Sequence, residues 1–178
     1  MSPLRPALLL AVVGAALGAG VLAIGSSASP SASGALAKIS PVRVDGVHLG
    51  DTHTDLRARG KVGPIQPGCK LAENTRSARL RPPLRGIVNY TQSSPRRVDN
   101  IAVRGGAAAR GVGIGATIAQ IKAKFPRAKV IHRFEQVFQL TLVRTPKRPN
   151  GRGRITFGVS TLTHKTTIIG VPFIAFCE

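Results

Sequence analysis

Apolar and polar side chains alternate along much of the second half of the chain. This two-residue period, together with many β-branched and aromatic residues, is typical of strands. The pattern predicts strands at residues 85–90, 98–104, 129–133, 137–144, 154–160 and 166–176. Prolines between residues 64 and 95 break that part of the chain into short pieces, so the strands around residues 69–71 and 80 have less defined ends.

One short segment carries clear signals for a helix. Thr117 suits the N-cap, and Gln120 three residues later completes a capping box, in which each side chain bonds the backbone N–H of the other residue. Ile121 and Phe125 then fall on one helical face, and Pro126 ends the helix. The sequence therefore predicts a short amphipathic helix after Thr117.

A weaker copy of this pattern occurs earlier in the chain. Thr52 suits an N-cap, and Asp55 is favoured near the positive end of a helix dipole. Leu56 supplies the apolar face, and Gly60 ends the helix. This pattern predicts a helix of one or two turns.

Both helix starts belong to matching segments, residues 46–56 and 111–121. The matching positions are Gly46/Gly111, Val47/Val112, Leu49/Ile114, Gly50/Gly115, Thr52/Thr117 and Leu56/Ile121. Because strands are expected after each helix, the sequence predicts an α+β fold of two helix-then-antiparallel-strands repeats. The repeats would span about residues 44–105 and 110–178 and form one sheet, with the short helices packed on one face.

The N-terminal segment has the composition of a targeting signal. Arg5 precedes an uncharged apolar run at residues 7–24, and small residues follow at 25–37. This order is typical of a secretory signal peptide, with cleavage after Ala28 or Ala37, and an uncleaved membrane anchor is the alternative. We expect residues 1–37 to be signal peptide and spacer, and residues 38–178 to be a single domain, secreted or held at the outer face of a bacterial cell envelope.

Cys69 and Cys177 are the only cysteines of the chain. Export would place them in an oxidising compartment, where one structural disulfide is the expected outcome. A bridge that closes so long a loop contributes about 4–5 kcal/mol in the chain-entropy model. The alternative, a nucleophilic cysteine, lacks supporting structure because Cys177 is next to the last residue.

The tandem motif Gly-Val-x-Leu/Ile-Gly-x-Thr-x-x-x-Leu/Ile resembles the repeats of secreted β-lactamase-inhibitory proteins and of related small lipoproteins of outer-membrane assembly. It is also similar to motifs in actinobacterial secreted proteins of unknown function. The resemblance implies a fold of helices on an antiparallel sheet and suggests, as one possible role, a protein inhibitor of an extracellular enzyme. The chain departs from the lipoproteins in having no lipidation cysteine after the apolar run.

Charge is the second strong feature of the sequence. The chain has 26 Lys and Arg against 7 Asp and Glu, for a formal net charge of +19. Turn-forming residues at 144–154 place a cluster of cations at an expected hairpin tip, namely Arg144, Lys147, Arg148, Arg152 and Arg154. A second group comprises Arg76, Arg79, Arg81, Arg85, Arg96 and Arg97. Such clusters either bind an anionic partner or form a solvated surface that aids solubility.

Three patterns raise the question of catalysis. His48, Asp51, His53 and Asp55 are metal-ligating residue types, although a solvated helix start explains them equally simply. Residues 111–115 carry the glycines of a dinucleotide loop, but the expected surroundings are antiparallel rather than βαβ. With 7 acids and no Gly-x-Ser-x-Gly elbow, the sequence predicts neither an enzyme nor a cofactor.

The combined features favour a secreted, non-enzymatic binding module. Its basic loops would face an anionic envelope polymer, a lipid surface or an acidic protein. The alternatives are the protein inhibitor that the resemblance implies and a metal-dependent hydrolase. Sequence-specific nucleic-acid binding is not expected for an exported chain with 4% aromatic residues, and a membrane would be contacted only through an uncleaved N-terminal segment.

Overall fold

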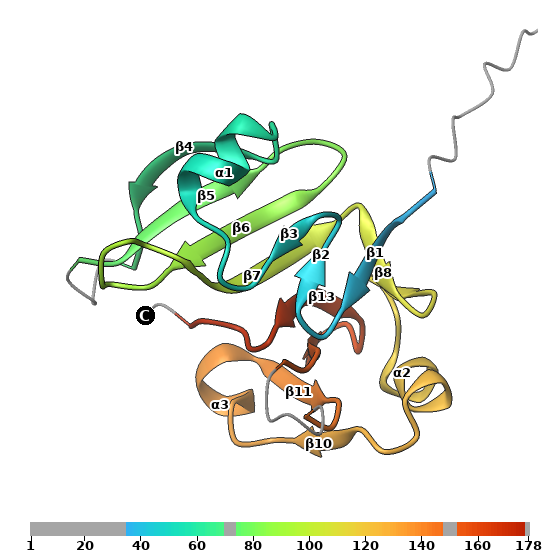
Figure 1. The fold of residues 1–178 in the computed structure, drawn as a ribbon. Coiled ribbons are helices and arrows are strands. Elements are labelled where there is room, and N and C mark those ends of the chain that lie inside the picture. The colour runs from blue at the N-terminus through green and yellow to red at the C-terminus, as the bar shows by residue number, and fades with distance from the viewer. Residues whose placement is uncertain (1–34, 70–73, 148–152, 177–178) are drawn as a thin grey trace, which may run out of the picture. The chain divides into compact units, whose positions relative to one another are not determined.

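The computed structural model describes residues 35–69, 74–147 and 153–176 (Figure 1). They belong to one compact unit, Gly34–Glu178. The fold is α+β and mostly sheet, as expected, but the strands form two sheets rather than one.

The larger sheet has eight strands, and all its neighbouring strands are antiparallel. Four come from the first half of the chain: β4 (Val62–Pro67), β5 (Arg76–Leu80), β6 (Arg85–Tyr90) and β7 (Val98–Gly105). Four come from the second half: β10 (Lys129–Ile131), β11 (Leu140–Arg144), β12 (Thr156–Ser160) and β13 (Thr166–Val171). Each set is a meander, and β7 pairs with β13 where the sets meet, which gives the order β10-β11-β12-β13-β7-β6-β5-β4.

The smaller sheet was not expected from the sequence. It contains β1 (Ala37–Ser40), β2 (Arg43–Val44), β3 (Val47–His48), β8 (Ala107–Ala109) and β9 (Val112–Gly113). Their order is β3-β2-β1-β8-β9, and β1 runs parallel to β8. The expectation of a single sheet was therefore wrong, because the chain forms two small hairpins where the sequence suggested only the approach to each helix.

Two-residue turns with positive φ close these hairpins. Asp45 and Gly46 have φ of 44° and 78°, and Arg110 and Gly111 have φ of 50° and 79°. Positive φ at both central residues is the geometry of a type I′ turn, which suits the twist of a hairpin. The Asp-Gly pair at 45–46 is the strongest short sequence signal for such a turn.

Each of the two expected helices begins at its threonine. Thr52 caps α1 (His53–Ala58), and Thr117 caps α2 (Ile118–Lys124). At α2 the capping box is complete, because the Thr117 hydroxyl accepts from the Gln120 N–H at 3.3 Å and the Gln120 side chain accepts from the Thr117 N–H at 2.9 Å. An N-cap of this kind contributes about 1 kcal/mol.

A third helix, α3 (Glu135–Phe138), replaces the start of the strand expected at 137–144. It ends at Gln139, whose φ of 52° turns the chain into β11. Phe138 stacks on Phe176 with ring centroids 4.1 Å apart. This aromatic contact stabilises one helical turn in a segment where the alternation of apolar and polar residues alone favours a strand.

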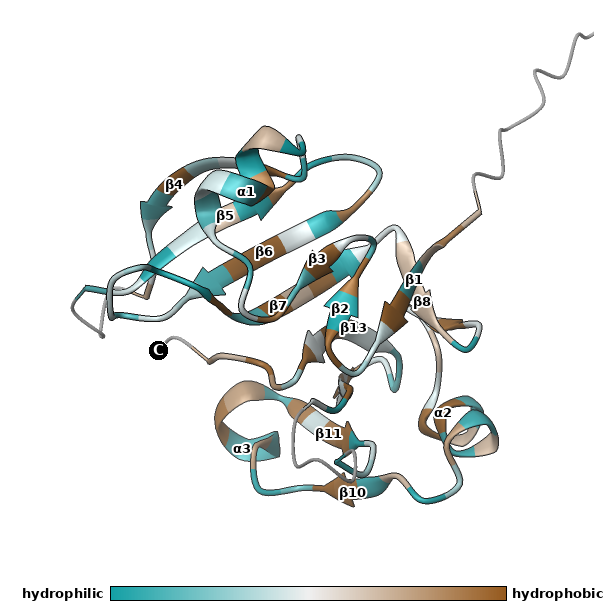
Figure 2. Ribbon diagram, viewed as in Figure 1, coloured by the Kyte–Doolittle hydropathy of each residue, from teal (hydrophilic) through white to brown (hydrophobic). Residues whose placement is uncertain are grey.

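Side chains on the two faces of the larger sheet pack into different apolar clusters. Val143 belongs to the main core, whereas its neighbour Leu142 belongs to a smaller cluster, as alternation along a strand requires. Leu56 of α1, Ile121 of α2 and Phe157 of β12 are fully buried members of the main core. Figure 2 shows an apolar block in the middle of β6 between hydrophilic ends.

Tyr90 is the only tyrosine of a chain without tryptophan, and its side chain is 4% exposed. Burial raises the pKa of Tyr90 to about 12. We therefore expect an ultraviolet absorbance titration to show ionisation near pH 12 in the folded protein and near pH 10 in denaturant. Since the folded pKa is raised, Tyr90 should stabilise the fold below pH 10 and lose this contribution as the pH rises through 12. Identical curves with and without denaturant would contradict the prediction.

Candidate anion-binding site

Positively charged side chains surround a cavity of about 410 Å³ beside β10, the end strand of the larger sheet. We call it the Lys129 cavity. Its charged lining residues are Arg127, Lys129, Arg144, Lys147 and Arg154. Ile131, Thr145 and Pro146 complete the lining, so no carboxylate is among the residues that form it.

Strand pairing brings the cations together. In the antiparallel pair of β10 and β11, Lys129 lies directly opposite Arg144. Beyond the ends of β11 and β12, the Thr145 N–H donates to the Ile155 carbonyl at 2.9 Å. The Ile155 N–H donates in return to the Thr145 hydroxyl at 2.9 Å. Because both Thr145 and Ile155 are buried, this clamp holds the backbone at Arg144 beside the backbone at Arg154.

Arg144 is the most constrained cation of the group. Its Nε is buried and has no hydrogen-bond partner among the described residues. Burial holds the pKa of Arg144 below its ordinary value, and the nearby charges of Arg154 and Arg133 lower this pKa further. The charged form of this guanidinium is therefore disfavoured by its surroundings, and a bound anion would stabilise it.

The described carboxylates are engaged elsewhere or lie outside the cavity. Asp51 pairs with Arg59 at 2.6 Å, and Asp45 pairs with Lys61 at 3.1 Å. Glu135 binds the hydroxyl of Thr141 and lies 2.6 Å from His132 Nδ1. Within the part of the chain that the structure describes, no salt bridge involves a cation of the Lys129 cavity.

A second cavity of about 300 Å³ adjoins the first. Arg144, Lys147 and Arg154 line both cavities, and Pro172 and Phe173 close the second one. We call it the Phe173 cavity. The three shared cations can therefore contact an anion in either cavity.

The structure brings three of the five expected tip cations together, namely Arg144, Lys147 and Arg154. Arg148 and Arg152 lie outside the described residues. Sequence reasoning missed Arg127 and Lys129. The expected strands at 129–133 and 137–144 would not have paired Lys129 with Arg144, because this register depends on α3 between β10 and β11.

The four candidate metal ligands have separate local partners. Asp51 accepts from the His48 N–H at 2.9 Å and from Arg59, whereas Asp55 accepts from the Thr52 hydroxyl at 2.7 Å. His53 Nδ1 lies 3.0 Å from the Tyr90 hydroxyl. Among the residues described, no group of three or more His, Cys, Asp or Glu side chains is placed to hold a metal ion.

The expected disulfide involves a residue that the structure does not describe. Cys69 is partly exposed in the chain after β4, and its carbonyl accepts from the Thr75 hydroxyl at 3.1 Å. Cys177 lies outside the described residues. The bridge therefore stays a prediction.

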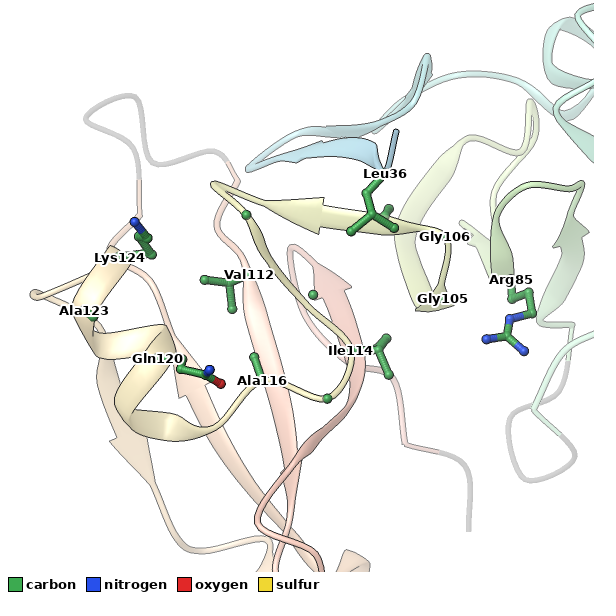
Figure 3. Close-up of a pocket in the computed structure, with 14 residues that line it drawn as sticks. Leu36, Arg85, Gly105, Gly106, Val112, Ile114, Ala116, Gln120, Ala123 and Lys124 are labelled. Carbon is green, nitrogen blue, oxygen red and sulfur yellow. The ribbon is translucent and has the colours of Figure 1, made fainter. Parts of the chain in front are cut away.

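A further cavity, of about 690 Å³, lies beside the glycine-rich loop at 111–115 (Figure 3). Its labelled side chains include Gln120 and Lys124 of α2 and Ile114 of the loop. Strand β9 of this loop pairs antiparallel with β8, and the strand after α2, β10, pairs antiparallel with β11. The loop is therefore not part of a βαβ unit, and its glycines at 111 and 115 serve turns with φ of 79° and 87°.

The second arginine group is not gathered around one of the cavities described above, and Arg85 is its one member that lines any of them, the cavity beside the glycine-rich loop. Arg97 donates to the Gly50 carbonyl at 3.0 Å, and Arg76 donates to the Thr75 carbonyl at 2.9 Å. Arg79 and Arg81 are exposed. These two residues provide a reference for cations that sit on an open surface.

None of the helices in the described ranges has the length and apolar character needed to cross a membrane. No protein-family model, no curated protein and no solved structure matches the chain, so the chemistry of the cation-lined cavities is what points to its function.

Proposed function

We propose that the protein is a secreted, non-enzymatic binding module that holds an anionic envelope polymer or an acidic protein in the cavities around Arg144. The observation that carries this proposal is the clustering of five cations around the Lys129 cavity with no carboxylate among the lining residues. Binding would use charge-assisted hydrogen bonds from guanidinium and ammonium groups and needs no cofactor.

The strand register supports a role for this charge. Like charges directly opposite each other on neighbouring strands destabilise a sheet, and Lys129 faces Arg144 in this way. The described carboxylates do not offset the repulsion, because none of them lines the cavity. A bound polyanion would remove the repulsion, so the arrangement favours binding over simple solvation.

The secreted location rests on residues 1–37. Ala37 already belongs to β1, where it pairs with Ala107 of β8. Cleavage after Ala28 would leave this strand whole, whereas cleavage after Ala37 would remove its first residue. Within the proposal, Ala28 is therefore the preferred cleavage position.

We also propose that the two halves of the chain are copies of one helix-then-strands unit. Thr52 and Thr117 cap their helices with nearly equal backbone angles, φ −86° with ψ 157° and φ −86° with ψ 165°. The Gly50 N–H bonds the Val98 carbonyl, and the Gly115 N–H bonds the Thr166 carbonyl, both at 2.8 Å. Val98 and Thr166 begin β7 and β13, the last strand of each meander.

Charge neutralisation within the site tests the proposed function. The double variant Arg144→Gln/Arg154→Gln should elute from heparin and polyglutamate columns at clearly lower salt than the unmodified protein. Arg79→Gln/Arg81→Gln lowers the net charge equally at exposed positions and should elute close to the unmodified protein. Because Arg144 is partly buried, Lys147→Gln/Arg127→Gln provides a second site variant at exposed positions.

Equal elution of the site variants and the Arg79/Arg81 control would mean that net charge, not the site, governs retention. That result would reject the proposed function. Thermal denaturation of each variant should accompany the columns, so that a change in retention is read only from folded protein.

A further inference from the structure

A third cavity continues the row of cations. It has a volume of about 620 Å³ and shares Arg127, Thr145 and Pro146 with the Lys129 cavity. Lys38 of β1 and Arg110 supply its other cations, and we call it the Lys38 cavity. As in the other two cavities, no carboxylate is among its lining residues.

The Arg110 side chain is held at this cavity. Its guanidinium carbon lies 5.2 Å from the centroid of the Phe125 ring, and Nη1 donates to the Lys124 carbonyl at 3.4 Å. Phe125 also lines the cavity. The Phe125 ring and the Lys124 carbonyl therefore position the Arg110 guanidinium, and no carboxylate does so, which leaves the cation able to contact a ligand.

Shared residues connect the three cavities in sequence. Arg127, Thr145 and Pro146 join the Lys38 cavity to the Lys129 cavity, and Arg144, Lys147 and Arg154 join the Lys129 cavity to the Phe173 cavity. We call the three together the cation track. A single small anion would fill only one of them, whereas a chain with charges at regular intervals could occupy all three.

We infer that the cation track binds a linear polymer of phosphate groups, with successive stretches of the polymer in successive cavities. This inference rests on the proposed function and adds to it the chemical class and the extended form of the ligand.

Phosphate suits the track better than carboxylate for two reasons. Five cations surround the Lys129 cavity, and a phosphate polymer carries a negative charge on every unit of its backbone, so it brings closely spaced charges to them. Arginine can also hold two phosphate oxygens at once, and Arg127, Arg144 and Arg154 provide three such guanidinium groups around one cavity. An acidic protein would instead contact the cation track through side-chain carboxylates, and its backbone is bulkier than that of a phosphate polymer.

Chain length provides the test. Binding of orthophosphate, tripolyphosphate and long-chain polyphosphate should be measured by titration calorimetry at fixed ionic strength, with affinities expressed per phosphate. We expect long chains to bind about tenfold more tightly or better than tripolyphosphate, because a chain that fills one cavity meets the next at high effective concentration. Oligoglutamate of matched charge should bind more weakly than long-chain polyphosphate.

Variants at the Lys38 cavity distinguish an effect of polymer length from an effect of the protein's net charge. Lys38→Gln/Arg110→Gln should remove most of the advantage of long chains and leave tripolyphosphate binding nearly unchanged. Arg79→Gln/Arg81→Gln, which has the same net charge, should keep the full advantage. Lys38→Gln alone, at an exposed strand position, should remove part of it.

The outcomes distinguish this inference from the proposed function. If Arg144→Gln/Arg154→Gln weakens binding but long and short chains bind equally per phosphate, the polymer inference fails and the anion site remains. If oligoglutamate binds as tightly as polyphosphate, the assignment of phosphate fails. If the Arg144/Arg154 variant binds every probe like the unmodified protein, both proposals fail.

Discussion

Gly106→Ala is expected to lower the free energy of unfolding by about 3–5 kcal/mol. Gly106 has φ of 81°, a backbone conformation that strains any residue with a Cβ. An added Cβ would also overlap the backbone carbonyl of Pro83 and lie 3.1 Å from the Leu84 Cα. Neither backbone can move freely, because Gly106 links β7 of the larger sheet to β8 of the smaller one and its carbonyl accepts from the Ala37 N–H.

Gly111→Ala is the matched control for this variant. Gly111 has nearly the same φ, 79°, but nothing lies within 4 Å of a Cβ added there. It should lose only the conformational strain, about 1–2 kcal/mol. Chemical denaturation followed by circular dichroism measures both variants. Equal losses of unfolding free energy in the two variants would show that the Pro83 carbonyl can shift away from the added Cβ at little energetic cost.

Phe157→Ala should destabilise the protein by a similar amount, about 3–5 kcal/mol. Phe157 is fully buried, and its ring centroid lies 5.7 Å from that of Phe125. It belongs to the main core cluster, so its removal would open a cavity within that core, next to Phe125 at the end of α2. Leu162→Ala, at a side chain that is 74% exposed, should change stability by less than about 0.5 kcal/mol.

A loss of less than about 1 kcal/mol for Phe157→Ala would mean that the site collapses around the missing ring. It would contradict a main core whose packing depends on this side chain. Denaturant titrations of both variants at the same protein concentration measure the difference.

Local signals predicted the elements that local contacts stabilise. The strand expected at residues 85–90 matches β6, and the capping box of Thr117 and Gln120 is formed within one helical turn. The helix α3 escaped prediction because the stacking of Phe138 on Phe176 joins residues far apart in the chain. The smaller sheet escaped for the same reason, since its parallel pair of β1 and β8 depends on the meander between them.

The candidate site also combines residues that local sequence signals placed together with residues that only the fold brings to them. Arg144 and Arg154 flank one expected turn, so composition alone placed them together. Lys129 joins them only through the register of β10 on β11, and Lys38 only through the fold of the smaller sheet. A cation that reaches the site from a distant strand cannot be recognised from the sequence pattern, whereas a cluster of cations around an expected hairpin turn can.

The register of Lys129 has a consequence for solubility as well as for binding. β10 stands at one end of the larger sheet, where unpaired backbone groups could recruit a strand from another molecule. It is only three residues long, and its lysine repels an approaching chain of the same sequence. The charge that the proposed anionic ligand would bind therefore also protects the open border of the sheet, and a ligand that covers this charge must cover the border too if strand addition is to be prevented.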